Sequence, residues 1–284
     1  MKALCSSLAL AIALPAAACG GASRTSPATQ PGLAAFDPAA SDPRALALVD
    51  QAVAALGGRA EWDKVKQIQW NERHTLEGKL VGVSGHAWDR WNGRHRFEEF
   101  SIASMERAEK EGRPDEIQVQ VAMYDLFDHQ GKGTVTVDNV RVDAATRDKV
   151  IAIAYDVFRE ASYRLAAVYK LEDPGVKLAM AEPIQPVKDH CKPSCEVVRV
   201  TFAPAAGTDT WLVGFNSQSK LPEILEKQLP KGRVGLGLSG WTKVGGLKFP
   251  TRIENLGPGE VFQISNIRVG DPDDDLYIPS VVDQ

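Results

Sequence analysis

Apolar residues recur at helical spacing over only one long stretch of the chain, between Asp143 and Leu178. Its polar start is followed by an apolar arc made of Val150, Ile151, Ile153, Ala154, Val157, Phe158 and Ala161. An arc this wide is typical of a helix that contacts sheet over much of its circumference. The pattern therefore predicts a helix to about Ala161 lying in a curved sheet, after which the chain returns to the sheet through an Asp173-Pro174-Gly175 turn.

A shorter helix is predicted near the N-terminus. Asp42 is a suitable N-cap, Pro43 suits the first helical position, and apolar residues then recur at helical spacing until Gly57-Gly58. A short helical turn around Trp62 leads into the first strand, where Ile68 and Trp70 share a face.

Most of the remaining sequence alternates as strands do, with glycine and proline at the joins. Residues 107–115 are polar and are interpreted as a turn region, and Val119, Val121 and Met123 alternate after it. Counting both sides of the central helix gives about ten or eleven strands at meander spacing. The sequence thus predicts a mainly β protein with helices (α+β), and Gly235, Gly237 and Gly240 suit points of sharp sheet curvature.

Asn92-Gly93 is the strongest hairpin signal, because this dipeptide favours a two-residue type I′ turn. That turn would place Trp88 opposite Phe97 on the concave face. On the other face it would place Asp89 opposite Arg96 as an ion pair.

The N-terminus has the pattern of an export signal over residues 1–18: Lys2, an apolar run, and then small residues before Cys19. Residues 16–19 resemble the lipobox of bacterial lipoproteins, in which the cysteine is acylated. Ala16 stands where leucine is usual, so cleavage as an ordinary secretion signal is the alternative. Residues 19–41 are rich in Ala, Pro, Ser, Thr and Gly and predict a disordered tether, and residues 42–284 form one domain.

Cysteine parity favours acylation. Once Cys5 is removed with the signal, a lipidated Cys19 leaves Cys191 and Cys195 as an even pair in an oxidising compartment. We therefore expect a local Cys191–Cys195 disulfide. Half of a zinc site is the alternative, but the sequence has no second cysteine pair to complete it.

Charge and motifs argue against several functions. Lys and Arg number 33 against 37 Asp and Glu, interspersed along the chain, which makes nucleic acid an unlikely partner. His86 and Glu99 would face each other across the hairpin with His95 nearby, yet ordinary strand histidines explain this set better than a metal does. No nucleophile elbow or phosphate loop is present. We expect no enzyme activity, no catalytic residues, no cofactor and no metal.

Three short motifs resemble a known group. They are similar to segments of uncharacterised bacterial lipoproteins within the LolA/LolB-like superfamily. The motifs are residues 56–65, residues 163–178, and residues 246–253 together with Asp275-Leu276-Tyr277. Arg164 departs from this pattern, which has an aromatic residue there. The similarity spans most of residues 43–280.

The resemblance implies an unclosed antiparallel β-barrel capped by helices, with a hydrophobic cavity and the internal helix plugging the open side. The residues expected to line that cavity are Trp70, Trp88, Phe97, Met123, Phe158, Trp211 and Phe215. Two hypotheses follow: a membrane-anchored carrier of lipid or another apolar ligand, or a structural lipoprotein with a filled barrel and an envelope protein as partner. Because Gly20 stands where Asp would favour inner-membrane retention, the expected location is the outer membrane, facing the periplasm.

Overall fold

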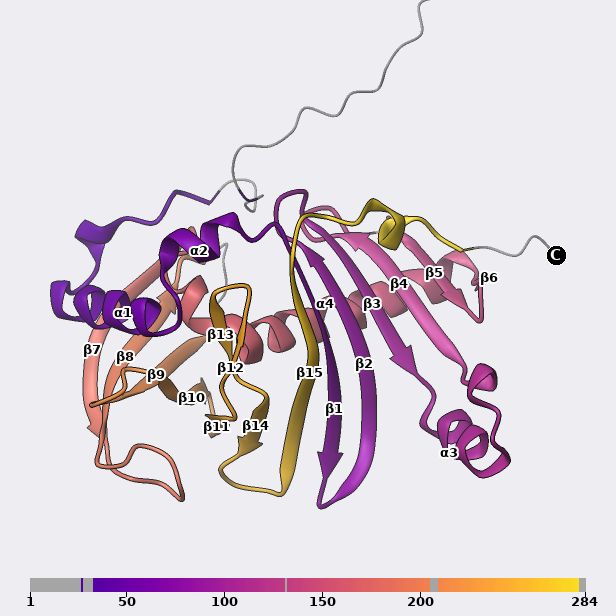
Figure 1. Ribbon diagram of the computed structural model, residues 1–284. Helices are drawn as coiled ribbons and strands as arrows, with labels where there is room; N and C mark the ends of the chain where they lie inside the picture. The colour runs from indigo at the N-terminus through magenta and orange to yellow at the C-terminus, as the bar shows by residue number, and fades with distance from the viewer. Residues whose placement is uncertain (1–26, 28–32, 131, 205–208, 281–284) are drawn as a thin grey trace, which may run out of the picture.

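One antiparallel sheet of thirteen strands curves around a single long helix in the computed structural model (Figure 1). The structure describes residues 27, 33–130, 132–204 and 209–280. The strand order is β6-β5-β4-β3-β2-β1-β15-β14-β11-β10-β9-β8-β7, so the described sheet ends in two edges, β6 and β7, and does not close. The predicted mainly β architecture with an unclosed sheet is confirmed. The predicted signal segment and Cys19 lie outside the described residues.

The strands of this sheet follow the chain as a meander interrupted by the central helix. Their bounds are β1 Gln67–Leu76, β2 Lys79–Asp89, β3 Arg94–Phe100, β4 Val119–Asp125, β5 Thr134–Val137, β6 Val140–Arg141, β7 Val176–Ile184, β8 Cys195–Phe202, β9 Thr210–Asn216, β10 Pro222–Leu229, β11 Gly232–Ser239, β14 Arg252–Asn255 and β15 Glu260–Gly270. A separate two-stranded sheet joins β12 (Thr242–Val244) to β13 (Leu247–Phe249). Pro250, which cannot donate to a ladder, separates β13 from β14.

The central helix, α4, spans Ala144–Ala166 and begins as predicted. The Asp143 side chain accepts hydrogen bonds from the amides of Ala145 and Thr146, which stabilises the helix start. The predicted end at Ala161 is wrong, because no glycine or proline stops the helix there and Leu165 is buried in the core. A 3₁₀ turn, η3 (Ala167–Lys170), follows. Ile153, assigned to the apolar arc, is 61% exposed, so the buried arc is narrower than predicted.

The N-terminal helices cover one end of the sheet. After η1 (Pro38–Ala40), α1 (Pro43–Ala55) starts at the predicted N-cap Asp42, and α2 (Arg59–Lys64) follows Gly57 and Gly58, which both have positive φ. Ser41 and Asp42 also hydrogen-bond the outer edge of β7: the Leu178 amide donates to Ser41 Oγ and the Leu178 carbonyl accepts from the Asp42 amide. This contact covers part of an otherwise open strand edge.

The β2–β3 hairpin is paired two residues away from the predicted register. Asp89 lies opposite Arg94 and His86 opposite Phe97, so the predicted Asp89–Arg96 and Trp88–Phe97 pairs are wrong. The buried Asp89 carboxylate accepts from the amides of two loop residues and from the Arg94 guanidinium, and these bonds stabilise a longer loop over residues 90–93. A shift of two residues leaves each side chain on its predicted face.

Two further predictions fail next to this hairpin. The region expected as a polar turn forms α3 (Ile102–Glu111), capped by Ser101, and is followed by η2 (Pro114–Glu116). In β4, the main core contains Ala122 and Tyr124, while Met123 lies opposite Arg96 and its sulfur accepts from that guanidinium. Met123 is therefore on the face of the sheet turned away from α4.

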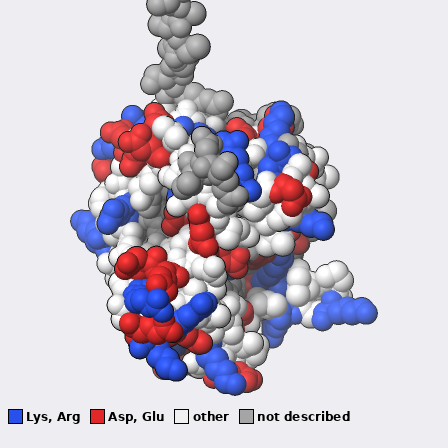
Figure 2. All heavy atoms as spheres, turned by 90° about the vertical axis from the view of Figure 1, so that its right-hand side faces the viewer, with Lys and Arg blue, Asp and Glu red and all other residues white. Residues whose placement is uncertain are grey.

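The surface agrees with the interspersed charges of the sequence. Figure 2 shows Lys and Arg mixed with Asp and Glu over the end of the molecule that carries β5, β6 and α3. The last element, η4 (Asp274–Tyr277), returns to the sheet, where Asp274 pairs with Arg94 at 2.6 Å. Within the described residues, no helix combines the length and the apolar character needed to cross a bilayer.

Candidate functional site

The interior at the predicted cavity is packed with side chains. Trp70 stacks on His86 at a centroid distance of 4.5 Å, Trp88 meets Phe158 edge-on at 5.4 Å, and Trp211 stacks on Tyr163 at 5.4 Å. Phe97 and Phe215 are buried in the same cluster, and Met123 lies outside it. Whether any of these residues contacts a ligand stays a prediction, but the structure shows them filling space rather than enclosing it.

Open space lies beside α4 instead. A groove of about 440 Å³ separates one side of the helix from β1, β2, β3 and β15. Its apolar walls include Val81, Val83, Phe97, Val157 and Phe262. We call this space the α4 groove. Among the predicted lining residues, only Phe97 borders it.

A buried ion pair forms the polar floor of the α4 groove. The Arg164 Nη2 donates to Glu72 Oε2 at 2.7 Å, and the two side chains are only 10% and 4% exposed. Glu72 also accepts from the Trp70 indole, and the Arg164 guanidinium lies 4.0 Å from the Phe262 ring centre. The Arg164 Nε is buried without a hydrogen-bond partner among the described residues.

A chain of polar side chains runs from the groove into the core. Ser84 Oγ lies 3.2 Å from His86 Nε2, His86 Nδ1 lies 3.3 Å from His95 Nε2, and His95 Nδ1 lies 2.8 Å from the Tyr124 hydroxyl. Burial, with a smaller contribution from the nearby positive charge of Arg164, lowers the pKa of His86 to about 3. Burial also lowers the pKa of His95 well below its usual value, with His86 adding to the effect. Both rings are therefore neutral at physiological pH, and His86 is a poor base for activating Ser84.

The rim of the α4 groove is acidic. Glu99, Asp156 and Glu160 border it, and only Glu160 has a close lysine partner, Lys227 at 2.9 Å. A second hollow of about 370 Å³ shares Val81 and Glu99 with the groove and continues towards α3. The two hollows therefore adjoin at these residues of β2 and β3.

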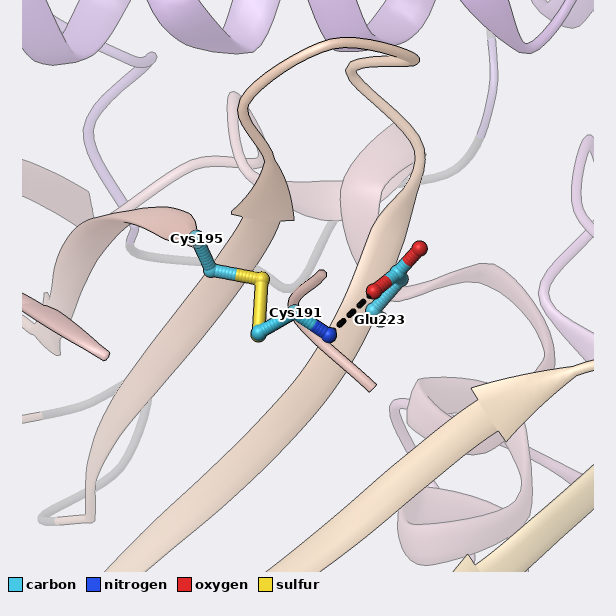
Figure 3. Close-up of side chains that lie close together, drawn as sticks. All are labelled: Cys191, Cys195 and Glu223. Carbon is cyan, nitrogen blue, oxygen red and sulfur yellow. Dashed lines mark hydrogen bonds between the residues drawn. A yellow bond between two sulfur atoms is a disulfide. The ribbon is translucent and has the colours of Figure 1, made fainter. Parts of the chain in front are cut away.

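The cysteine pair is a disulfide, as predicted (Figure 3). Glu223 lies beside it, and the three side chains have the spacing of metal ligands. Both sulfur atoms are bonded to each other, however, and Glu223 accepts hydrogen bonds from the Cys191 amide and from Asn216. The cluster therefore holds the loop between β7 and β8 against β9 and β10.

The histidine arrangement differs from the sequence prediction. Glu99 lies opposite Ser84 rather than opposite His86, because the hairpin register is shifted. His86 and His95 contact each other directly, and this pairing was not anticipated. The groove residues Glu72 and Arg164 were not predicted from the sequence. Two signals pointed to them. Glu72 lies two positions after Trp70 on a buried strand face, and Arg164 stands where the related lipoproteins have an aromatic residue.

Comparisons with known proteins give structural neighbours only. No family model and no curated protein sequence matches the chain. Similar solved structures include a LolA superfamily protein. This protein, from Nitrosomonas europaea, has a TM-score of 0.44 and 12% identity over 82% of this chain and 97% of its own. MucB has a TM-score of 0.24 and 12% identity over 84% of this chain and 63% of its own. A MucA/MucB complex from Pseudomonas aeruginosa has a TM-score of 0.20 and 13% identity over 81% of this chain and 60% of the matched one.

Proposed function

We propose that the chain is a membrane-anchored, non-catalytic lipoprotein that binds a lipid or another apolar ligand in the α4 groove. The observation that carries this proposal is the groove itself. Its volume of about 440 Å³ falls in the range of small-molecule sites, and five apolar side chains form its walls around the Glu72–Arg164 ion pair. Burial of an acyl chain against these walls would supply the binding free energy.

The anchor in this proposal is an acyl group on Cys19, at the outer membrane facing the periplasm. The lipobox-like sequence and the even cysteine pair that remains support it. Labelled palmitate should enter the natural protein and be absent from a Cys19→Ser variant. Equal labelling of both proteins, or a mature N-terminus with unmodified Cys19, would contradict the anchor.

A non-catalytic role is supported by the contact between the Ser84 hydroxyl and the His86 imidazole at the groove. His86 is buried, and its pKa of about 3 leaves it a weak proton acceptor for Ser84. Ester and peptide substrates should therefore be left intact by the purified protein. Turnover that is lost in Ser84→Ala would contradict this part of the proposal.

The ligand proposal is tested by native mass spectrometry of protein purified gently from the envelope. Val157→Trp would fill the groove from α4, whereas Ala152→Trp places the same side chain on the exposed, opposite side of the same helix. We expect a bound lipid mass in the natural protein and in the Ala152→Trp control, and its loss in Val157→Trp. Retention of the lipid in both variants would place it elsewhere and contradict the proposal.

The alternative is a structural lipoprotein with a filled barrel that binds an envelope protein. The packing of Trp88 on Phe158 and of Trp211 on Tyr163 favours it, because the interior there holds no space for a ligand. Under this alternative the natural protein carries no lipid, and crosslinking in intact cells yields one specific protein partner.

A further inference from the structure

The polar floor of the α4 groove restricts the chemistry of its ligand. Resting on the proposed function, we infer that the groove selects a neutral amphiphile with an ester or amide carbonyl over a free fatty-acid carboxylate of the same chain length. The inference rests on how Arg164 is partnered, on the charge of Glu72 and on the acidic rim.

Arg164 offers a hydrogen-bond donor that the protein does not use. Its Nη2 donates to Glu72 and its Nε is enclosed by protein, whereas its Nη1 keeps accessible surface and has no acceptor among the described residues. A ligand oxygen that reaches Nη1 accepts a charge-assisted hydrogen bond, which is stronger than one between neutral groups. The side chain borders the groove and is held in place over the Phe262 ring, so the donor is preorganised.

The charge of Arg164 is already balanced. Glu72 lies 2.7 Å from the guanidinium and is buried, so the floor as a whole is an ion pair without net charge. A ligand carboxylate at Nη1 would add a second anion beside Glu72 in a place where water screens poorly. A carbonyl oxygen accepts the same hydrogen bond without that repulsion.

The rim acts in the same direction. Glu99 and Asp156 border the entrance, and Asp156 has only a distant Arg159 partner, 3.8 Å away. Lys227 sits close to Glu160 but is also paired with Asp209, so it is not free for an incoming anion. An anionic headgroup is therefore repelled at the rim, and a neutral one is not.

The test compares monolauroylglycerol, a neutral ester, with laurate, the anion of the same chain length. Binding of each to the full mature chain is measured by calorimetry at about pH 8, below the concentrations at which they form micelles. We expect the ester to bind at least about tenfold more tightly, which corresponds to about 1.4 kcal/mol. Laurate binding as tightly as the ester, or more tightly, would overturn the inference and leave the proposed function standing. Failure of both probes to bind would overturn both.

A charge variant sharpens the test. Glu72→Gln keeps an acceptor for Arg164 but removes the negative charge. The ratio of ester affinity to laurate affinity should therefore fall by at least about tenfold. The matched control is Glu98→Gln, because Glu98 pairs with Arg96 on the other face of β3. An unchanged ratio in a folded Glu72→Gln protein would overturn the inference. If that variant does not fold, the ratio measured on the natural protein decides.

Discussion

The buried His86–His95 pair should make the protein lose stability at mildly acidic pH. Both rings are buried, joined by a hydrogen bond of 3.3 Å, and neither forms an ion pair with a carboxylate among the described residues. Protonation of His86 would place a charge near Arg164, and protonation of either ring would place one beside the other ring. The unfolded chain has no such restriction, so it takes up protons first as the pH falls.

The magnitude follows from the pKa of His86, which falls from 6.5 in the unfolded chain to about 3 in the folded one. Because the folded pKa is lowered, the unfolded state binds more protons between these values, and stability is complete above about pH 6.5 and falls below it. Between about pH 8 and pH 5 the loss from His86 alone is about 2 kcal/mol. His95, whose pKa is also lowered by burial, adds a loss of the same sign.

The assay is urea unfolding followed by tryptophan fluorescence at about pH 8, 6.5 and 5. His86→Gln should be less stable than the natural protein at about pH 8, because it loses the stacking on Trp70, but it should lose about 2 kcal/mol less on acidification. His129→Gln, at a ring stacked on Tyr155, serves as the control and should keep the full loss. Equal stability of the natural protein at pH 5 and 8, or an unchanged loss in His86→Gln, would refute the reasoning.

Three further perturbations test the fold around the site. Cys191→Ser with Cys195→Ser should cost about 2 kcal/mol in urea unfolding, since the disulfide closes a short loop, and a stability equal to that of the natural protein would show that the bridge contributes nothing. Gly237→Ala should cost about 1–3 kcal/mol because its Cβ would lie 2.2 Å from His190 Nε2, whereas Gly270→Ala, with nothing within 4 Å, should be close to neutral. Asp89→Asn should lower the thermal midpoint by removing charge-assisted bonds to Arg94 and to the loop amides, and an unchanged midpoint would contradict that role.

Local signals in the sequence predicted the elements that depend on local chemistry. The start of α4 follows from one side chain, Asp143, that accepts from amides two and three residues ahead. Glycine at positions 57 and 58 ends the first helical region for an equally local reason, a positive φ. The disulfide was predicted from parity and compartment alone.

The strand register and the sheet face on which each side chain lies were harder to predict, because they depend on contacts made only in the folded chain. Asn92-Gly93 alone favours a two-residue turn, but the Asp89 carboxylate also binds the loop amides and Arg94, and four residues are then left unpaired. In β4 both Met123 and Tyr124 are apolar enough for the core. The hydroxyl of Tyr124 finds a partner in His95, and Met123 finds one in Arg96 on the other face.

The groove could not be predicted because it depends on residues far apart in the sequence. Glu72 and Arg164 are 92 positions apart, and neither looks unusual until α4 lies against β1. The helical pattern gave the apolar arc of α4 but not its edge, where Val157, Glu160 and Arg164 follow one another along the side that faces the groove.

The position of the groove bears on whether α4 must move for a ligand to enter. Ile151 and Phe158, at the centre of the buried arc, are 2% and 6% exposed, so the helix is fixed to the sheet along that line. The groove runs beside this line, past Val157, and joins the hollow towards α3 through Val81. Under the proposed function, a ligand would approach along the surface of β2 and reach Arg164 while the packed arc of α4 stays in place. Helix α4 would then be a fixed wall of the groove, and selection of the ligand would depend on the polar floor and the acidic rim rather than on the opening of a lid.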